Sequence, residues 1–422
     1  MAFSFRRQPL RFFYLVVTIL IILFIRLPYW LARYAIPAAR PRPSWTLSRS
    51  LIVQFFRVYV NVLWDTEIPT WVPPDPKAQS ADADGLVAVD AAPQYVKGEV
   101  GRMAEANGVS AVDVSGYWVG RRGADGKPGQ KAEAGEKVVY HLHGGGFVMG
   151  AGKPTEGVMK DLYAGFQQYF PSTPRIFALE YRISAGPPFE PRNPFPAPLL
   201  DAVAGYNYLV NTLGFTSQNV VISGDSAGGA LAVWFVRYLI AFEFKDLPFP
   251  GAVLLFSPTV DFANTHIGPN SSMARNARSD FVEPIVASGY TYRALTGNLS
   301  VHDREAMAWI APASRSLEPE RVSGLFRGFP KTCIVVGGAE QTYDPVVTLR
   351  NRIVAESGAD AVHFIDKPDA THDFCSFAWH EPERTDALKD VDKADGSSSM
   401  LRYPPSRGLR RDKLGVSFLA DG

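Results

Sequence analysis

Gly224-Asp225-Ser226-Ala227-Gly228-Gly229 is the stretch of this sequence that decides its fold. It lies between an apolar run, Val220-Val221-Ile222, and a helix-compatible run from Ala230 to Tyr238. A Gly-x-Ser-x-Gly motif between a strand and a helix is typical of a sharp turn that lifts a nucleophilic serine above the edge of a sheet. Such a turn leaves almost no room for side chains beside the serine, and the two flanking glycines meet that demand. We therefore predict that Ser226 is a nucleophile.

A second glycine-rich stretch, His143-Gly144-Gly145-Gly146-Phe147, follows the apolar run from Val138 to Leu142. Glycines after a strand let backbone N–H groups approach a reacting carbonyl, which provides an oxyanion hole without a charged side chain. Either motif alone is weak evidence, because a glycine-rich loop can also hold phosphate and Gly-x-Ser-x-Gly arises by chance. In this order the pair predicts a serine hydrolase, and two purely structural glycine turns are the alternative.

These two motifs, followed by a late acid and a late histidine, resemble the hormone-sensitive-lipase-like branch of the α/β-hydrolases. That branch includes arylacetamide deacetylases and fungal sterol deacetylases. The similarity runs from about Val138 to Phe374, and the longer proline-rich stretch from Ala185 to Pro198 departs from the family pattern. Three further stretches match family motifs: Glu180-Tyr181-Arg182-Ile183, Phe195-Pro196-Ala197 with Asp201, and Ser257-Pro258-Thr259-Val260-Asp261.

The resemblance implies an α/β-hydrolase fold, with a mostly parallel central sheet, helices on both faces and a helical lid. It implies a serine carboxylester hydrolase that acts through an acyl-enzyme on a hydrophobic ester, such as a lipid, a steryl acetate or an aryl acetate. It also implies that the backbone N–H groups of Gly145, Gly146 and Ala227 hold the oxyanion. A non-catalytic ligand-binding protein and an acyltransferase on the same fold are the alternatives.

A serine nucleophile needs a histidine as base and a carboxylate that fixes the tautomer of that histidine. In this fold the chain order is serine, acid, histidine. His372 follows the last predicted strand by a short loop and heads Thr371-His372-Asp373-Phe374, which resembles the family's H-D-F. We therefore predict that His372 is the base. His143 opens the glycine-rich loop, and we expect it to brace that loop by hydrogen bonding.

Two acids compete for the remaining role. Glu340 leaves the carboxyl end of a predicted strand, Thr332 to Val336, where the fold places its triad acid. Asp344-Pro345 is typical of a helix start, with aspartate as N-cap and proline in the first turn. Asp344 therefore already has a structural task, and we predict that Glu340 is the acid and Asp344 the alternative. The family usually carries aspartate at the position of Glu340, so the longer glutamate is a departure.

The N-terminal region carries the other strong signal. Arginines precede an uncharged run from Phe12 to Ile25, which spans only about 21 Å as a helix. The run reaches the ~30 Å of a bilayer core if it continues through Arg26 to Ala32. We predict a retained single-pass anchor in the membrane of the endoplasmic reticulum; a cleaved signal sequence and a buried or surface helix are the alternatives. Sequons at Asn270 and Asn298 permit a lumenal catalytic domain.

Apolar residues recur at helical spacing from Ser44 to Trp64, which predicts an amphipathic helix. It could form part of a lid, pack on the domain or lie in the membrane interface. Trp71 to Ala92, rich in Pro, Asp and Ala, reads as a linker or exposed loop. We expect four regions: a membrane anchor and juxtamembrane segment at 1–43, a lid helix and linker at 44–100, a catalytic domain at 101–388 with a lid insertion at about 262–312, and a loosely ordered tail at 389–422.

Strands and helices alternate through the catalytic region, which favours a largely parallel sheet with helices on both faces. An early antiparallel strand is predicted from Val109 to Gly120. The later strands are predicted at 138–142, 176–180, 220–223, 252–257, 332–336 and 361–365.

Composition narrows the possible partners. The net charge is +1 with 20% charged residues, which gives no argument for nucleic acid or an acidic partner. Cys333 and Cys375 are too few for a disulfide scaffold or a cysteine-rich metal site. We expect no cofactor and no metal, a small hydrophobic ester as substrate, and the membrane as partner through the N-terminal segment. The oligomeric state is left open.

Overall fold

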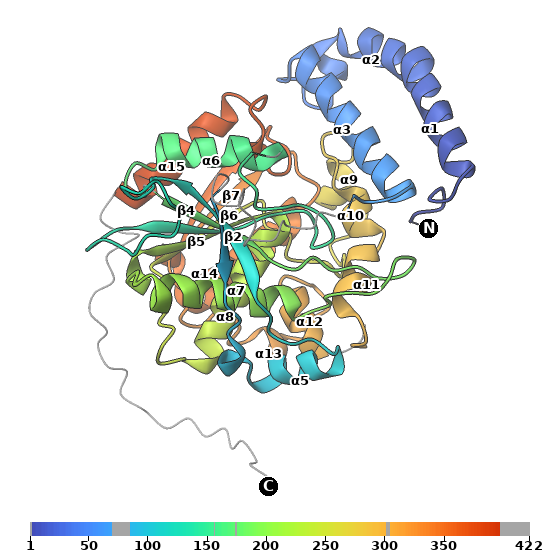
Figure 1. Ribbon diagram of the computed structural model, residues 1–422. Coiled ribbons are helices and arrows are strands. Elements are labelled where there is room, and N and C mark those ends of the chain that lie inside the picture. The colour runs from blue at the N-terminus through green and yellow to red at the C-terminus, as the bar shows by residue number, and fades with distance from the viewer. Residues whose placement is uncertain (1, 70–84, 156, 174, 301–303, 397–422) are drawn as a thin grey trace.

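An eight-stranded sheet forms the centre of the computed structural model, which describes residues 2–69, 85–155, 157–173, 175–300 and 304–396 (Figure 1). The strand order is β1-β2-β4-β3-β5-β6-β7-β8. β2 pairs antiparallel with both β1 and β4. From β4 to β8 along this strand order, every neighbouring pair is parallel. The strands are β1 Leu86–Val89, β2 Val114–Gly120, β3 Val138–Leu142, β4 Arg175–Glu180, β5 Val220–Asp225, β6 Ala252–Phe256, β7 Thr332–Gly337 and β8 Val362–Lys367.

Helices cover both faces of the sheet, as its burial requires. Every residue of β3, β4, β6 and β7 is buried, and strands of this kind need a helix layer on each side. One face carries α7 (Ala197–Asn207), α8 (Ser226–Phe242) and α14 (Tyr343–Ser357), and the other carries α6 (Gly157–Tyr169) and α15 (Glu383–Gly396) (Figure 1). The predicted fold class, an α/β-hydrolase fold with a mostly parallel sheet, is confirmed.

Three local expectations need correction. Residues 86–89, expected within a linker or exposed loop, form the edge strand β1, because Leu86 and Val89 bury their side chains against the sheet. The first antiparallel strand begins at Val114 rather than Val109. Residues 389–396, expected in a loose tail, complete α15. Residues 70–84 and 397–422, which carry the rest of the linker and tail expectations, lie outside the described residues.

The carboxyl ends of the parallel strands meet at one edge of the sheet, where ligands bind in folds of this kind. Ser226 begins α8 directly after β5, and the glycine-rich loop at 143–146 follows β3. Glu340 comes shortly after β7, and His372 comes shortly after β8. Topology alone therefore brings the predicted site residues to one edge.

Several short helices lie within the expected lid insertion at 262–312. They are α9 (Ser272–Arg275), α10 (Glu283–Ala287), α11 (Tyr290–Thr296) and α12 (Arg304–Ile310). Ile285 of α10 lines the cavity that contains Ser226. α12 instead packs against α8, where the Arg237 guanidinium lies 4.4 Å from the centre of the Trp309 ring. The described catalytic region also contains the helices α5 (Gly98–Ala106) and α13 (Pro319–Val322).

A helical hairpin precedes the catalytic region. α1 (Leu10–Ile21), a π-helical turn (Ile22–Arg26) and α2 (Leu27–Tyr34) form one continuous helix, and α3 (Leu47–Asp65) runs alongside it (Figure 1). Among the described residues, Leu10–Tyr34 is the helix whose length and apolar composition suffice to cross a membrane. The expected amphipathic helix at 44–64 corresponds to α3, which begins after an N-cap at Thr46.

Candidate active site

Ser226 occupies a strained turn that only glycine neighbours permit. Its φ is +49°, a left-handed conformation that is rare for a residue with a side chain. A Cβ on Gly224 would lie 2.3 Å from the carbonyl oxygen of Gly228, and a Cβ on Gly228 would lie 1.9 Å from the carbonyl oxygen of Leu142. Both distances are far below van der Waals contact. The sequence Gly-x-Ser-x-Gly is therefore a packing requirement of the turn.

His372 lies between the serine and a carboxylate. Its Nε2 is 2.9 Å from Ser226 Oγ, and its Nδ1 is 3.2 Å from Glu340 Oε2. All three side chains are buried. Ser226 Oγ also lies 3.1 Å from the hydroxyl of Thr259, whose backbone N–H donates to the Ser226 carbonyl. The structure thus brings the predicted serine, histidine and glutamate into one chain of hydrogen bonds.

The carboxylate of Glu340 is saturated with donors. Ser257 Oγ (2.6 Å) and the Gly337 N–H (2.5 Å) donate to its Oε1. Thr342 Oγ1 (3.1 Å) donates to its Oε2, the oxygen that also faces His372. Four donors around one carboxylate fix its position and match its negative charge.

Asp344 lies in a different network. Its Oδ2 accepts from the Ser272 N–H at 2.8 Å, and its Oδ1 pairs with Arg275 at 3.1 Å. The expected N-cap at Asp344 is wrong, because α14 begins at Tyr343 and Thr342 precedes it at the cap position. Asp344 sits instead in the first turn, where a negative charge also suits the helix dipole.

Two further carboxylates surround His372. Asp373 Oδ2 lies 3.4 Å from its Nε2, and the backbone N–H of His372 donates to Asp280 at 3.3 Å. Burial alone favours the neutral imidazole, but the surrounding carboxylates outweigh it and raise the pKa of His372 to about 10. Burial also raises the pKa of Asp280 to about 6 and that of Asp373 well above its usual range. The site therefore gathers three acidic side chains, Glu340, Asp373 and Asp280, around one buried imidazole.

The glycine-rich loop lies beside the serine with its backbone exposed to the cavity. Gly145 has a φ of +111°, and a Cβ there would lie 2.1 Å from the Met149 carbonyl oxygen. Gly146 has a φ of +61°, so both residues hold conformations that favour glycine. Ala227 is in the first turn of α8, where backbone N–H groups have no partner within the helix. These three residues are the ones predicted to supply the oxyanion hole.

His143 holds the glycine-rich loop in place through a hydrogen bond and a stacked ring. Its Nδ1 lies 2.7 Å from the Gly144 carbonyl oxygen, and its ring stacks on Tyr181 at 4.1 Å between centroids. The Tyr181 hydroxyl in turn donates to the His143 carbonyl. Burial lowers the pKa of His143 to about 4, so this imidazole is neutral at physiological pH. These contacts agree with the bracing role expected from the sequence.

The remaining described histidines do not belong to the Ser226–His372–Glu340 chain of hydrogen bonds. His141 contacts Ser223 and Asp225, both at 3.1 Å. His266, expected in the lid, is buried against Asp261 at 2.7 Å. His380 accepts from a backbone N–H, and His363 is an exposed residue of β8. His302 lies outside the described residues.

A cavity of about 440 Å³ opens onto Ser226 and His372. Its walls are mostly apolar and come from the catalytic region and from α3. The α3 side chains are Phe56, Tyr59, Val60 and Leu63. The large apolar side chains that the catalytic region contributes are Met149, Val158, Met159, Phe281, Val282, Ile285 and Phe377. A space of this size and lining suits a small apolar ligand.

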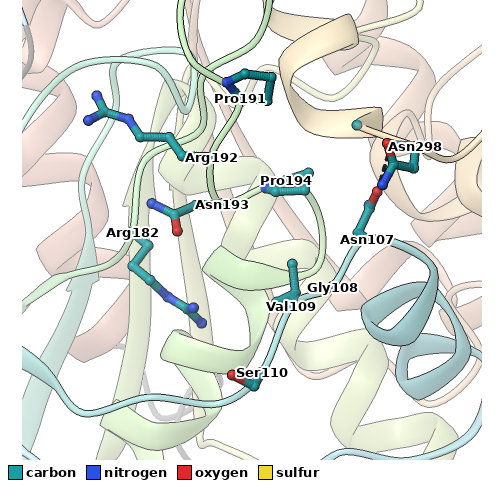
Figure 2. Close-up of a pocket in the computed structure, with 11 residues that line it drawn as sticks. Asn107, Gly108, Val109, Ser110, Arg182, Pro191, Arg192, Asn193, Pro194 and Asn298 are labelled. Carbon is teal, nitrogen blue, oxygen red and sulfur yellow. Dashed lines mark hydrogen bonds between the residues drawn. The ribbon is translucent and has the colours of Figure 1, made fainter.

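A second, polar pocket of about 290 Å³ lies away from the serine (Figure 2). Two of its polar side chains already have partners: Arg182 makes an ion pair with Asp201 at 2.8 Å, and Asn107 accepts from the backbone N–H of Asn298 at 2.7 Å. Figure 2 shows the Arg192 side chain directed away from these asparagines. The pocket lining contains none of the predicted catalytic residues, and no group of metal-ligating side chains is found in the described part of the chain.

Sequence reasoning assigned no role to several residues that surround the site. Ser257 and Thr259 belong to a stretch that matched a family motif, which was the available signal. Thr342 lies 3.1 Å from both Glu340 and His372 and follows the acid by two residues. Asp280 carried no signal, because nothing in the pattern around it predicts that its carboxylate meets the His372 backbone.

Comparisons with known proteins find relatives of the same fold. Residues 139–376 match a protein family described as alpha/beta hydrolase fold. An esterase of Acinetobacter venetianus is 27% identical over 263 residues, which cover 60% of this chain and 73% of the relative. Steryl acetyl hydrolase 1 of Saccharomyces cerevisiae is 23% identical over 228 residues, 54% of this chain and 49% of that protein. The crystal structure of the HSL-homolog EstE7 from a metagenome library is similar in fold, with a TM-score of 0.52, 21% identity and coverage of 82% and 97% of the two chains.

Proposed function

Because this chain belongs to the alpha/beta hydrolase fold family, we propose that it hydrolyses carboxylic esters through an acyl-enzyme formed on Ser226. One observation carries the proposal: His372 lies within hydrogen-bonding distance of both Ser226 and Glu340. The family name alone does not imply activity, because one fold hosts many functions. The serine–histidine–acid geometry is what favours a hydrolase over a non-catalytic binding protein.

Acylation begins with the neutral form of His372. Nε2 takes the proton of Ser226 Oγ while Oγ bonds to the ester carbonyl carbon. The backbone N–H groups of Gly145, Gly146 and Ala227 stabilise the oxyanion that forms. When the tetrahedral intermediate collapses, the bond to the alcohol oxygen breaks and Nε2 gives its proton to that oxygen. Ser226 is then acylated and the alcohol leaves.

Deacylation repeats the sequence with water. Water adds to the acyl carbon and gives a proton to Nε2, and the collapse of the second intermediate breaks the bond to Ser226 Oγ. The proton returns to Oγ as the carboxylic acid leaves. Throughout, Glu340 accepts from Nδ1–H and stabilises the imidazolium. Its extra methylene relative to aspartate is accommodated because Ser257 and Gly337 anchor the far oxygen.

The substrate we propose is a hydrophobic ester with a short acyl group, such as a steryl or aryl acetate. The apolar lining of the cavity supports a hydrophobic ligand, and a yeast relative is named for steryl acetyl hydrolysis. We also propose attachment to the membrane of the endoplasmic reticulum through Leu10–Tyr34. Asn270 and Asn298 are exposed, so a glycosidase-sensitive shift in mass would support a lumenal catalytic domain.

The test uses the full chain in detergent. A fluorophosphonate probe should label the wild type and fail to label Ser226→Ala, because covalent capture requires an activated serine. Hydrolysis of p-nitrophenyl esters with acyl chains of graded length should then fall as the chain lengthens. Absence of labelling in a folded protein would favour the binding-protein alternative. Ester products formed in the presence of added alcohols, in place of free acid, would favour the acyltransferase.

A further inference from the structure

The apolar helix Leu10–Tyr34 is covered along one continuous stripe. The covered side chains recur every three or four residues, as they do on one face of a helix. A single five-residue step occurs at the π-helical turn Ile22–Arg26, and this turn keeps the stripe in register. The buried or half-buried residues of the stripe are Arg11, Tyr14, Leu15, Thr18, Ile21, Ile22, Leu27, Trp30 and Tyr34.

The stripe contacts α3 near both ends of the long helix. Near one end, the Trp30 and Phe55 rings meet edge to face at 5.6 Å between centroids. Trp30 and Tyr34 form a buried cluster with Val58. Near the other end, the Tyr14 hydroxyl donates to Asp65 at 2.5 Å. The long helix and α3 therefore form a hairpin rather than two independent segments.

The N-terminal end of this hairpin is fixed to the catalytic region. Phe3 is only 3% exposed, and its ring lies 4.8 Å from those of both Phe189 and Tyr290. Its backbone N–H donates to the carbonyl of Trp64 at the end of α3. The chain just before the apolar helix is thus buried against the same region that holds the active site.

The segment after the apolar helix is fixed to the same region. Arg42 donates to Asn276 at 2.7 Å and to the Gly338 carbonyl at 2.9 Å. The Trp45 indole N–H donates to the Asp369 carbonyl at 2.7 Å. α3 itself is held by an ion pair between Arg49 and Glu383. Both ends of the helix therefore return to one folded body.

This geometry conflicts with a helix that crosses a bilayer. The ends of a crossing helix lie on opposite sides of a hydrocarbon core about 30 Å thick, and a folded domain cannot extend through that core. Arg26 would also lie only about 6 Å past the middle of the helix, where a charge is expensive. In the structure Arg26 is exposed at the side of the hairpin, from which an arginine can reach the lipid headgroups.

We propose that Leu10–Tyr34 lies in the plane of one leaflet and does not cross the membrane, with α3 between it and the catalytic region. The inference rests on the membrane attachment proposed above. The lipid-facing surface is formed by the exposed apolar side chains outside the stripe, which include Phe12, Phe13, Val16, Val17, Ile19, Leu20, Leu23, Phe24 and Ile25. The covered stripe against α3 takes the place of the polar face that an interfacial helix usually has.

In this placement α3 lies between the membrane-bound helix and the active-site cavity. α3 contacts the apolar helix through Phe55 and Val58, and it lines the cavity through Phe56 and Tyr59. Tyr59 is 56% exposed, so the cavity reaches the surface on the hairpin side. An ester dissolved in the same leaflet would reach Ser226 along α3. The substrate class is thus an ester that stays in the bilayer.

The experiment tests on which side of a sealed membrane the two helix ends lie. Gln8→Cys and Ala38→Cys place thiols at exposed positions just outside the helix, and Ile267→Cys reports the side of the catalytic region. The native Cys333 and Cys375 are buried and give a low background. With a membrane-impermeant maleimide, we expect all three variants to label from the same side. Labelling of Gln8→Cys and Ala38→Cys from opposite sides would overturn the proposal in favour of a single-pass anchor.

A fourth variant separates this inference from membrane attachment itself. Phe24 is 73% exposed in the structure, so Phe24→Cys should label readily only after detergent removes the lipid. Full labelling of Phe24→Cys without detergent would contradict membrane attachment, whatever the other variants show. None of these readouts depends on ester hydrolysis, so a failure of the proposed enzymatic function would leave them interpretable.

Discussion

The active-site edge of the sheet and the N-terminal hairpin hold their residues in opposite ways. At the sheet edge, Ser226, Glu340 and His372 are buried, and hydrogen bonds from neighbouring loops fix each of them. On the hairpin, large apolar side chains of α1 such as Phe12, Phe13 and Val17 are exposed. The contrast separates a site that the chain completes by itself from a surface that needs lipid. Changes in the two regions should therefore affect different measurements.

Ser226→Ala should give the largest effect on catalysis. Removing a triad nucleophile lowers kcat by about 10⁴- to 10⁶-fold, and the small side chain should leave the fold intact. The measurement is kcat on p-nitrophenyl acetate together with the melting temperature. Ser323→Ala, an exposed position after α13, is the matched control and should behave as wild type. A mutant that keeps a tenth of the activity would exclude Ser226 as nucleophile.

Glu340→Gln and Asp344→Asn form the next comparison, within the active-site edge itself. An amide at 340 cannot stabilise the imidazolium or hold its tautomer, so kcat should fall by up to about 10⁴-fold. Asp344→Asn removes one ion pair with Arg275, which is half exposed, and should cost at most about 1 kcal/mol of stability with activity retained. The reverse pattern of activity loss would reassign the acid to Asp344.

The two acids also show what the sequence could and could not predict. The turns at Ser226 and Gly145 were predictable, because a β-strand followed by glycines at fixed spacing leaves few other conformations. The choice between Glu340 and Asp344 rested on a weaker argument about helix capping, and the cap position was wrong by two residues. Of the donors to Glu340, Gly337 and Thr342 are its near neighbours in the sequence, but Ser257 is 83 residues away, and a contact between such distant residues has no local signature.

Asp373→Asn should move the pH dependence of activity with a smaller change in maximal rate. The Asp373 carboxylate favours the imidazolium form of His372, which cannot accept the proton of Ser226. An amide removes that charge and lowers the pKa of His372, so the acidic limb of kcat/KM should move to lower pH by about 1 pH unit. The melting temperature should stay close to that of the wild type, which would show that the fold is intact. A shift to higher pH would mean that Asp373 assists proton transfer instead.

The N-terminal hairpin was also only partly predictable, because its contacts join residues that are distant in the sequence. Hydropathy indicated an apolar helix, and its length was compatible with a span. The stripe that faces α3 depends on a π-helical turn at Ile22–Arg26, which the sequence pattern does not predict. The anchoring of Phe3 against Phe189 and Tyr290 joins residues far apart in the chain. Periodicity detects the helix but not its partner.

Phe24→Asp should give the smallest effect on catalysis and a clear effect on membrane binding. Phe24 is exposed and does not line the active-site cavity, so kcat/KM for the water-soluble p-nitrophenyl acetate should stay within roughly twofold of wild type. A carboxylate on the lipid-facing surface opposes insertion, so a smaller fraction of the protein should stay with membranes after a carbonate wash. Phe24→Leu keeps the apolar character and is the matched control. If the lipid-facing side of the hairpin does not shape the active site, Phe24→Asp should lose activity only on an ester presented in lipid vesicles. A parallel loss on the soluble ester would show instead that the hairpin shapes the active site through α3.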